Sequence, residues 1–482
     1  MGDNNSGGIK ISKQSFISSV VIIFTLMMIA GILTWVIPAG SFEHAIVDGR
    51  DTILPGTYQF ADTGGYAIWR WFTAPFEVVF SSDGPTVVVI ILFIFIIGGT
   101  FCTLDKSNML QYIMNSLVKK FGKQKYRLMG ILILFFMLFG SAFGIFEELV
   151  ALVPIVIVLS YALGWDSLTG LGMSALAAGF GFSAATLNPF TLGVAQKLAG
   201  LPAFSGILFR IGVFLIFYIL LYLFNLKYAK KIEKDPTLSL VYKEDLEQRK
   251  KYGNMSAIEE LPNAQYLGKS VRIFSAALVL VIVYIVISFF VPVMASISLP
   301  VMAVLFLIGG IIAAKTSHYG GNLSKDFIHG ILCIAPSAIL ILMAMSVKLI
   351  ISNGGIMDTI LYYAANRIES MGEYGAIVMI FGLVLLLNFF IGSGSAKAFL
   401  LIPIIAPLAD LVGLTRQVAV QAFCFGDGFT NMLYPTNPLL MITLGVTVVS
   451  YPKWFKWTIG LQLTVLALNV GLLLLAVMIN YG

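Results

Sequence analysis

Charge is scarce in this chain of 482 residues. Only 11% of the residues are charged, whereas 59% are apolar and the mean hydropathy is +0.93. No soluble core could bury this much hydrocarbon, so the composition predicts an all-α polytopic membrane protein. The pI near 9.0 does not indicate a nucleic-acid partner, because basic residues in such a chain mark the cytoplasmic side of the membrane.

Histidine and cysteine are also rare. The three cysteines are isolated in apolar segments, which does not imply a disulfide framework. No His-Glu-x-x-His pair is present, and the three histidines lie outside the predicted membrane core; they are His44, His318 and His329. An intramembrane enzyme needs a nucleophile with a base or a metal. The sequence therefore predicts no enzyme, no catalytic residue, no cofactor and no certain metal site.

A pattern of glycine, proline and asparagine occurs twice, in residues 131–189 and 380–438, at a constant offset of 249. The pair Asn188-Pro189, for example, falls on Asn437-Pro438. Glycine, proline and asparagine are the residues at which backbone geometry is decided. The shared spacing therefore predicts two structural repeats rather than a chance match between apolar sequences.

Each repeat contains a short hairpin followed by an interrupted helix. Residues 128–162 hold two apolar arms around a polar tip. At roughly 1.5 Å per residue each arm is too short for a membrane core of about 30 Å, so a re-entrant hairpin is predicted. Residues 167–200 follow as a helix broken at 183–189. The second repeat gives a hairpin at 376–409 and a broken helix at 418–450.

The remaining apolar segments predict full spans, giving about nine transmembrane helices when each broken helix counts as one. Residues 1–226 form the first repeat, 227–272 a cytoplasmic linker and 273–482 the second repeat. With the N-terminus in the cytoplasm, the predicted inner segments hold 22 of the 30 Lys and Arg residues, as expected for that side. The two hairpins are then opposed. Counting each hairpin as two full crossings gives the same parity, so the charges do not test re-entrance.

Two inverted copies with a hairpin and a broken helix are typical of secondary transporters. Such repeats bring hairpin tips and helix breaks to the midplane, where helix ends and freed carbonyls bind ions and substrates. The same glycines and prolines could instead only pack or kink helices. A passive channel would differ by conducting current without saturable counterflow.

Four charged residues fall at the predicted tips and breaks, where lipid exposure would be costly. They are Glu147, Glu148, Lys397 and Asp427. Glu148 and Lys397 are equivalent at the offset of 249, so the repeat symmetry predicts that they face each other and bind a zwitterion. The alternative is a structural ion pair between them. Neighbouring helical residues point about 100° apart, so Glu147 and Glu148 cannot line one surface.

Uncharged polar residues at the tips and breaks could bind a carboxylate or Na⁺, or only form hydrogen bonds between helices. The predicted substrate-binding residues are Glu147, Glu148, Asn188, Ser393, Ser395, Lys397, Asn431 and Asn437. The candidates for ion or proton coupling are Glu147, Asp427, Thr186 and Thr436, and a Na⁺ site could lie near Gly144 and Gly394.

Four segments resemble one family: ILTWVIPAGSF at 32–42, FEELVALVPIVI at 146–157, TLNPFTLGVA at 186–195 and TNPLLMITLG at 436–445. They look like the YfcC family, which is grouped with bacterial arginine/ornithine antiporters and anaerobic dicarboxylate carriers of the ion transporter superfamily. The resemblance implies an inverted-repeat fold and a homodimer in the bacterial inner membrane. It also implies an elevator-like transport domain, formed by the hairpins and broken helices, and a scaffold formed by the other spans. Members with Ser-Asn-Thr tips use them for carboxylate and Na⁺. Here the tips read GIFEE and GSGSAK, which favours a substrate with an amino group.

The sequence thus predicts a secondary active transporter of an amino acid, with exchange of basic amino acids such as arginine and ornithine as one form. The alternative is H⁺- or Na⁺-coupled transport of a short carboxylate or dicarboxylate.

Overall fold

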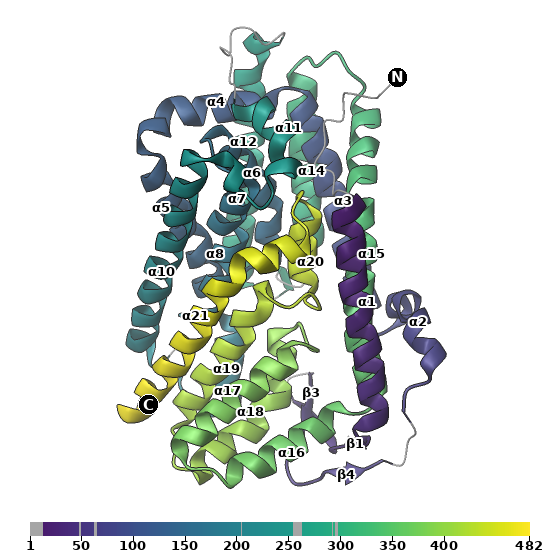
Figure 1. The fold of residues 1–482 in the computed structure, drawn as a ribbon, viewed down its shortest axis with the longest axis vertical. Coiled ribbons are helices and arrows are strands. Elements are labelled where there is room, and N and C mark those ends of the chain that lie inside the picture. The colour runs from purple at the N-terminus through teal and green to yellow at the C-terminus, as the bar shows by residue number, and fades with distance from the viewer. Residues whose placement is uncertain are drawn as a thin grey trace.

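The computed structural model describes residues 13–47, 50–61, 65–203, 205–253, 263–291, 293–294 and 297–482. The predicted tail up to residue 12 and residues 254–262 of the predicted linker lie outside this part. The described chain is a bundle of helices with a few short strands at one end (Figure 1). The all-α prediction is therefore confirmed.

The long helices follow the predicted full spans but extend past them into the polar flanks. They are α1 (Lys13–Val36), α3 (Gly84–Lys106), α10 (Ile207–Lys234), α12 (Ala264–Phe290), α14 (Ser298–Thr316), α15 (Leu323–Asn353) and α21 (Tyr451–Met478). Both ends of the predicted linker 227–272 are therefore helical, because α10 runs to Lys234 and α12 begins at Ala264. Lysine and glutamate favour helix, so the polar flanks continue the membrane helices.

Nine helices in the described chain are long and apolar enough to cross a membrane. Seven coincide with predicted full spans. The other two, Lys119–Phe143 and Gly394–Leu411, are arms of the predicted hairpins. The prediction also gave about nine spans, but it reached that number differently. It counted the two broken helices as spans, whereas in the structure each piece of a broken helix is too short to cross a membrane.

The first repeat is interrupted at the predicted positions. Its elements are α5 (Lys125–Leu138), the π-helical turn η3 (Phe139–Phe143), the 3₁₀ turn η4 (Glu147–Leu152), α6 (Val153–Ala162), α7 (Ser167–Met173), α8 (Ala175–Ser183), the π-helical turn η5 (Pro189–Gly193) and α9 (Val194–Leu198). The chain reverses at residues 144–146, which form the first tip. It leaves the helical conformation again at 184–188, which we call the first break.

The second repeat has the same order. Its elements are α17 (Glu373–Asn388), α18 (Gly394–Leu411), α19 (Arg416–Phe429), the 3₁₀ turn η8 (Thr430–Met432) and α20 (Pro438–Gly445). The second tip is residues 389–393 and the second break is residues 433–437. In Figure 1 the α5–α6 hairpin opens toward the upper end of the bundle, whereas the α17–α18 hairpin opens toward the lower end. The repeats are therefore inverted, and both tips point into the middle.

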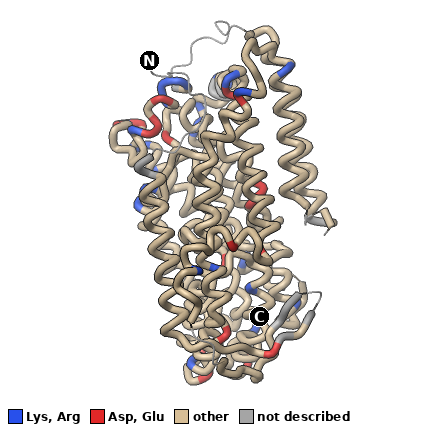
Figure 2. Tube along the Cα trace, turned by 90° about the vertical axis from the view of Figure 1, so that its right-hand side faces the viewer, with Lys and Arg blue, Asp and Glu red and all other residues tan. Residues whose placement is uncertain are grey.

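Short elements cover the two ends of the bundle. They are β1 (Gly40–Ser41), β2 (His44–Val47), β3 (Arg50–Ile53), β4 (Gln59–Phe60), α2 (Ile68–Glu77), η1 (Val78–Phe80), α4 (Met109–Phe121), η2 (Gly122–Gln124), η6 (Pro236–Leu238), α11 (Tyr242–Gly253) and α16 (Met357–Glu369). The strands form two antiparallel pairs, β1 with β4 and β2 with β3. Charged residues gather at the two ends, and only a few lie at mid-height (Figure 2).

The helices pack in two groups. Helices α1, α2, α3, α12, α14 and α15 contact one another, and we call them the outer group. Within it α3 and α15 approach closely, since a Cβ on Gly330 would lie 2.5 Å from the carbonyl oxygen of Gly98. The second group contains both hairpins, both broken helices, α10 and α21. The groups meet where α15 contacts α20, where α1 contacts α21 and where α14 contacts η4.

Candidate functional site

The first tip folds against the first break. Gly144 has a φ of +66°, a left-handed conformation that glycine adopts without steric cost. A Cβ at this position would also collide with Oδ1 of Asn188. The sequence thus places glycine where the hairpin reverses and where the broken helix approaches it most closely.

The contacts between this tip and break are hydrogen bonds between neutral groups. The Ser141 hydroxyl donates to the carbonyl of Ala184 at 2.6 Å, and the backbone N–H of Thr186 donates to the Ser141 carbonyl at 3.0 Å. The hydroxyls of Ser141 and Thr186 are 3.0 Å apart. These bonds satisfy backbone groups that the helix break leaves unpaired, as a buried break requires.

Asn188 begins the second half of the first broken helix. Its Oδ1 accepts from the backbone N–H groups of Phe190 and Thr191, at 2.9 and 3.2 Å, which is the usual role of an N-cap asparagine. Its amide nitrogen is buried and has no hydrogen-bond partner among the described residues, and the same holds for the hydroxyls of Thr191 and Ser183. Unpaired buried polar groups at a helix break are groups that a bound solute or water can satisfy.

The second tip and break are built around a buried ion pair. The Lys397 ammonium lies 2.5 Å from Oδ1 of Asp427, and the two side chains are 0% and 1% exposed. The same ammonium donates to Oδ1 of Asn388. Asn388 in turn donates to the Asp427 carbonyl at 2.9 Å and to Oδ1 of Asn431 at 3.1 Å, and it also contacts the hydroxyl of Thr430. Removing one partner of such a pair typically costs about 3–5 kcal/mol, because a buried charge is left uncompensated.

Asn437 begins the second half of the second broken helix. Its Oδ1 accepts from the N–H of Leu439 at 2.9 Å, as Asn188 does in the first repeat, and its amide nitrogen donates to Asn431 at 2.8 Å. The buried hydroxyl of Thr436 has no hydrogen-bond partner among the described residues. The two Asn-Pro pairs are thus helix N-caps, and Asn437 also extends the network around Lys397.

Both repeats meet at these breaks. A Cβ on Gly394 would lie 2.7 Å from Oδ2 of Asp427 and would collide with the methyl group of Thr191. A Cβ on Gly428 would lie 2.5 Å from the backbone nitrogen of Ser183. The start of α18 therefore touches the first broken helix, and the ion pair sits where the repeats come together.

The second tip is accessible from outside the protein. Gly392, Ser393 and Ala396 are exposed, and Ser395 is partly buried, although Lys397 one residue further is fully buried. The Ser393 hydroxyl caps α18 by accepting from the N–H of Ala396 at 3.4 Å. An approaching solute thus meets hydroxyl groups and a helix N-terminus directly above the buried charges, a combination suited to an anionic group.

The expected pairing of Glu148 with Lys397 is wrong. Glu148 accepts a hydrogen bond at 2.8 Å from Ser298 of α14, and Lys397 binds Asp427 instead. Repeat symmetry makes the two positions equivalent, but it does not make them close. Glu148 lies in the irregular turn η4 and faces the outer group, whereas Lys397 lies on a regular helix that faces its own broken helix. Glu147 is exposed, so the two acids do point in different directions.

Sequence reasoning missed Asn388, Thr430 and Thr191. Asn388 is a single polar residue in the apolar run LLLNFFIG, directly before the second tip. Its equivalent at the offset of 249 is Phe139, so a search for matched positions could not find it. Side-chain oxygens of Asn188 and Asp427 lie close to Gly144 and Gly394, respectively, and a Na⁺ site near these glycines stays a prediction. No group of three or more His, Cys, Asp or Glu residues is placed for a metal in the described chain.

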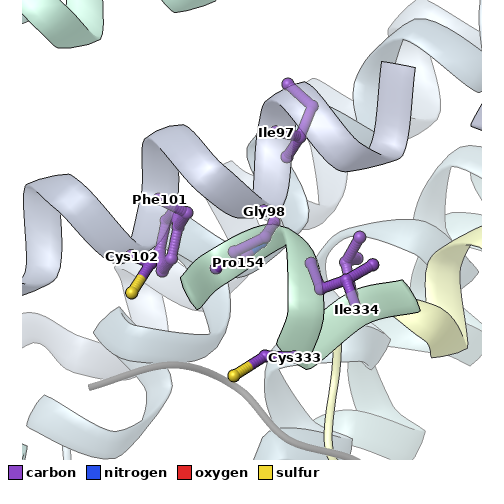
Figure 3. Close-up of a pocket in the computed structure, with 9 residues that line it drawn as sticks. Ile97, Gly98, Phe101, Cys102, Pro154, Cys333 and Ile334 are labelled. Atoms are coloured by element: carbon purple, nitrogen blue, oxygen red, sulfur yellow. The ribbon is translucent and has the colours of Figure 1, made fainter. Parts of the chain in front are cut away.

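The seam between the two groups of helices is mostly apolar. A small gap there is lined by Ile97, Gly98, Phe101, Cys102, Pro154, Gly330, Cys333, Ile334 and Val446 (Figure 3). Pro154 and Val446 come from the hairpin and broken helix, and the other seven residues come from α3 and α15. The hydrogen bond from Ser298 to Glu148 is a polar contact across the same boundary. Helix α11 adds polar links between the groups, because its Lys251 and Tyr252 bind Asp105 of α3 and its Asp245 accepts from Ser167 of α7.

These features define the class of the protein. A helical membrane protein whose chain reverses twice inside the bundle, against two broken helices in inverted orientation, is a membrane transporter. The family model described as "DcuC: C4-dicarboxylate anaerobic carrier" matches residues 16–478, so the chain belongs to this family.

Similar proteins cover nearly the whole chain. It is 32% identical over 467 residues to the Escherichia coli (strain K12) protein named "Putative basic amino acid antiporter YfcC", covering 91% of this chain and 92% of that protein. It is 26% identical over 514 residues to an uncharacterized protein of Haemophilus influenzae, covering 97% of each. The crystal structure of the Alcanivorax borkumensis YdaH transporter matches with a TM-score of 0.41 and 16% identity over 96% of this chain and 97% of that one.

Proposed function

We propose that the protein is a secondary active transporter that exchanges amino acids, basic ones in particular, across the bacterial cytoplasmic membrane. The observation that supports this proposal most directly is the buried pair of Lys397 and Asp427 beneath the exposed tip that contains Ser393. This site offers one cation and one anion within a few ångströms, together with hydroxyls and a helix N-terminus. A zwitterion is the solute that matches both signs.

The proposed binding mode assigns one end of the substrate to each charge. The α-carboxylate binds the hydroxyls of Ser393 and Ser395 and the N-terminus of α18, next to Lys397. The amino or guanidinium group competes with Lys397 for Asp427. Exchange is proposed from the name of the E. coli relative, which calls that protein an antiporter. The name of the relative in E. coli supports this substrate class.

We further propose that the second group of helices moves as the transport domain against the outer group. The apolar seam, with Glu148 and Ser298 as a polar contact across it, supports such movement. We place the end with α4 and α11 in the cytoplasm, in line with the lysines of α4 and with the orientation predicted from the charges. A homodimer is proposed from the family resemblance, and light scattering in detergent measures it.

A second candidate is transport of a C4-dicarboxylate. Lys397 with the two serines would bind a carboxylate, and the family description names this substrate. The ion pair disfavours it, because Asp427 already neutralises Lys397 and the site offers no excess positive charge for a dianion.

Counterflow in proteoliposomes separates the two candidates. Vesicles containing the purified protein are loaded with unlabelled arginine, ornithine, a neutral amino acid or succinate, and uptake of the labelled form of each is measured. Saturable counterflow of arginine and ornithine is expected. Counterflow of succinate alone would overturn the amino-acid proposal, and conductance without counterflow would overturn exchange.

A further inference from the structure

The ammonium of Lys397 lies where two helices end. Asn388 is the last residue of α17, and Asp427 lies in the last turn of α19. The C-terminal end of a helix carries a partial negative charge from its unpaired carbonyl groups. Two such ends, a carboxylate oxygen and an amide oxygen therefore converge on one nitrogen atom.

This environment is the kind that binds alkali cations in transporters. Broken helices of inverted-repeat carriers coordinate Na⁺ through unwound carbonyls and half-helix C-termini. Hard cations also prefer carboxylate, amide and hydroxyl oxygens. Asp427 and Asn388 each place an oxygen on the Lys397 ammonium, and the amide nitrogen of Asn388 links this point to Asn431 and Thr430. A side-chain cation therefore lies where a carboxylate oxygen and an amide oxygen meet.

We propose that Lys397 is a resident cation that takes the place of Na⁺, so that transport by this protein does not require Na⁺. This inference rests on the proposed function and names the coupling chemistry of that same site. It implies that the Lys397 side chain, rather than an ion from solution, neutralises Asp427 whenever no cationic substrate is bound. The first repeat has no such pair, since Glu148 and Ala178 stand at the positions equivalent to Lys397 and Asp427.

Removing the side-chain ammonium should create an alkali-cation site. In Lys397→Ala the oxygens of Asp427 and Asn388 remain and a volume the size of the lysine end opens between them. We expect 200 mM NaCl, compared with 200 mM choline chloride, to raise the Tm of this variant in detergent by about 3 °C or more, as a ligand that binds only the folded state does. The wild-type protein should show no difference between the two salts.

Two variants control for general effects. Lys348→Ala breaks a different lysine–aspartate pair, with Asp83 at 2.7 Å, in which both side chains are about one-third exposed. It should show no Na⁺-specific shift. The double variant Lys397→Ala/Asp427→Ala lacks the carboxylate and should lose the shift that the single variant gains.

The Na⁺-specific shift in Tm can contradict the proposal in either protein. A folded Lys397→Ala protein, monodisperse and helical by circular dichroism, that gains no Na⁺-specific shift would overturn the proposal. So would a Na⁺-specific shift in the wild type. If Lys397→Ala does not fold, the exchange rate of the wild-type protein is measured in Na⁺ and in choline. Rates that agree within twofold support the inference, and a rate that depends on Na⁺ overturns it. The Tm measurements need no substrate, so a failure of amino-acid counterflow leaves their result readable.

Discussion

The two inverted tips share a backbone plan but differ in charge. The first tip and break are joined by neutral groups, with Ser141 and Thr186 bonded to backbone and Asn188 capping η5. The second tip and break are joined by Lys397, Asp427 and Asn388, all fully buried. Both N-cap asparagines are retained, so the difference does not lie in the helix breaks themselves.

This difference indicates that the repeats have separate tasks. Neutral hydrogen bonds hold the first tip in place, and the nearby Glu148 contacts the outer group. The second tip combines a buried charge pair with an exposed serine, which is what recognition of a charged solute requires. Under the proposed function, the repeated backbone supplies the framework and the charged residues of the second repeat bind the substrate.

The largest effect is expected from Asp427→Asn, which removes the buried carboxylate and leaves Lys397 uncompensated. Exchange should fall at least about a hundredfold, and the free energy of unfolding should fall by about 3–5 kcal/mol. The paired variant Lys397→Met/Asp427→Leu should regain most of the stability, because an apolar pair needs no compensation, yet remain inactive. Counterflow and thermal unfolding measure the two effects. Glu148→Gln is the matched first-repeat change, and a greater loss of exchange there than in Asp427→Asn would reverse the comparison.

A smaller loss is expected from Gly394→Ala, since its Cβ would collide with Thr191 and crowd Asp427. The start of α18 must then shift away from the first broken helix, and exchange should fall about tenfold, equivalent to roughly 1.4 kcal/mol. Adding Thr191→Ser removes the methyl group in the collision and should restore part of the rate. Wild-type exchange in the single variant would show that the close approach of the repeats has no importance for transport.

The first tip should respond to Ser141→Ala in stability rather than in substrate affinity. Loss of the hydroxyl leaves the Ala184 carbonyl without its hydrogen bond, and the Thr186 hydroxyl keeps only its 3.4 Å bond to the Ser141 carbonyl, which costs about 1–3 kcal/mol. The Tm should drop while the KM for exchange stays within twofold. A large rise in KM with an unchanged Tm would assign the first tip to the substrate site.

The mildest prediction concerns α11, outside the membrane spans. Burial, and then the nearby Asp166 carboxylate, raise the pKa of Asp245 from 3.8 to about 7, although the Ser167 N–H donates to it at 2.7 Å. The folded protein therefore holds more protons than the unfolded one between these two values. Stability should fall as pH rises through this window, by up to about 1.4 kcal/mol per pH unit, and level off above it.

Thermal unfolding of the wild type and Asp245→Asn between pH 5 and 8.5 measures this effect. The Tm advantage of the wild type should shrink as pH rises toward 8, because asparagine does not titrate. Parallel curves would exclude Asp245 as the titrating group.

The fold could be predicted from the sequence because the residues that reverse or break a helix act on the backbone at their own position. Gly144 and the Asn188-Pro189 pair mark a reversal and a break whatever they contact, and both lie where expected. Long apolar runs likewise fixed the membrane helices. The predicted helix ends were wrong, because α10 and α12 continue into polar sequence, and the predicted arm length was wrong, because two hairpin arms are long enough to cross a membrane.

The site could be predicted only in part because side-chain pairing is not local. Lys397, Asp427 and the asparagines were identified by the cost of burying them. Their partners depend on helix rotation, which the offset of 249 does not encode. The repeat symmetry therefore predicted a contact between Glu148 and Lys397 that the structure does not contain. It did not indicate Asn388, because the equivalent position in the first repeat is not polar.

Substrate protection of a cysteine at the second tip tests the central claim most directly. The native cysteines are buried, so Ser393→Cys offers an exposed thiol for a membrane-impermeant maleimide, and Ser82→Cys serves as an exposed control outside both hairpins and both broken helices. With the substrate identified by counterflow at saturating concentration, labelling of Cys at position 393 should slow at least about fivefold, as expected for a largely occupied site, while labelling at position 82 stays unchanged. Equal labelling of position 393 with and without substrate would contradict a binding site at the second tip.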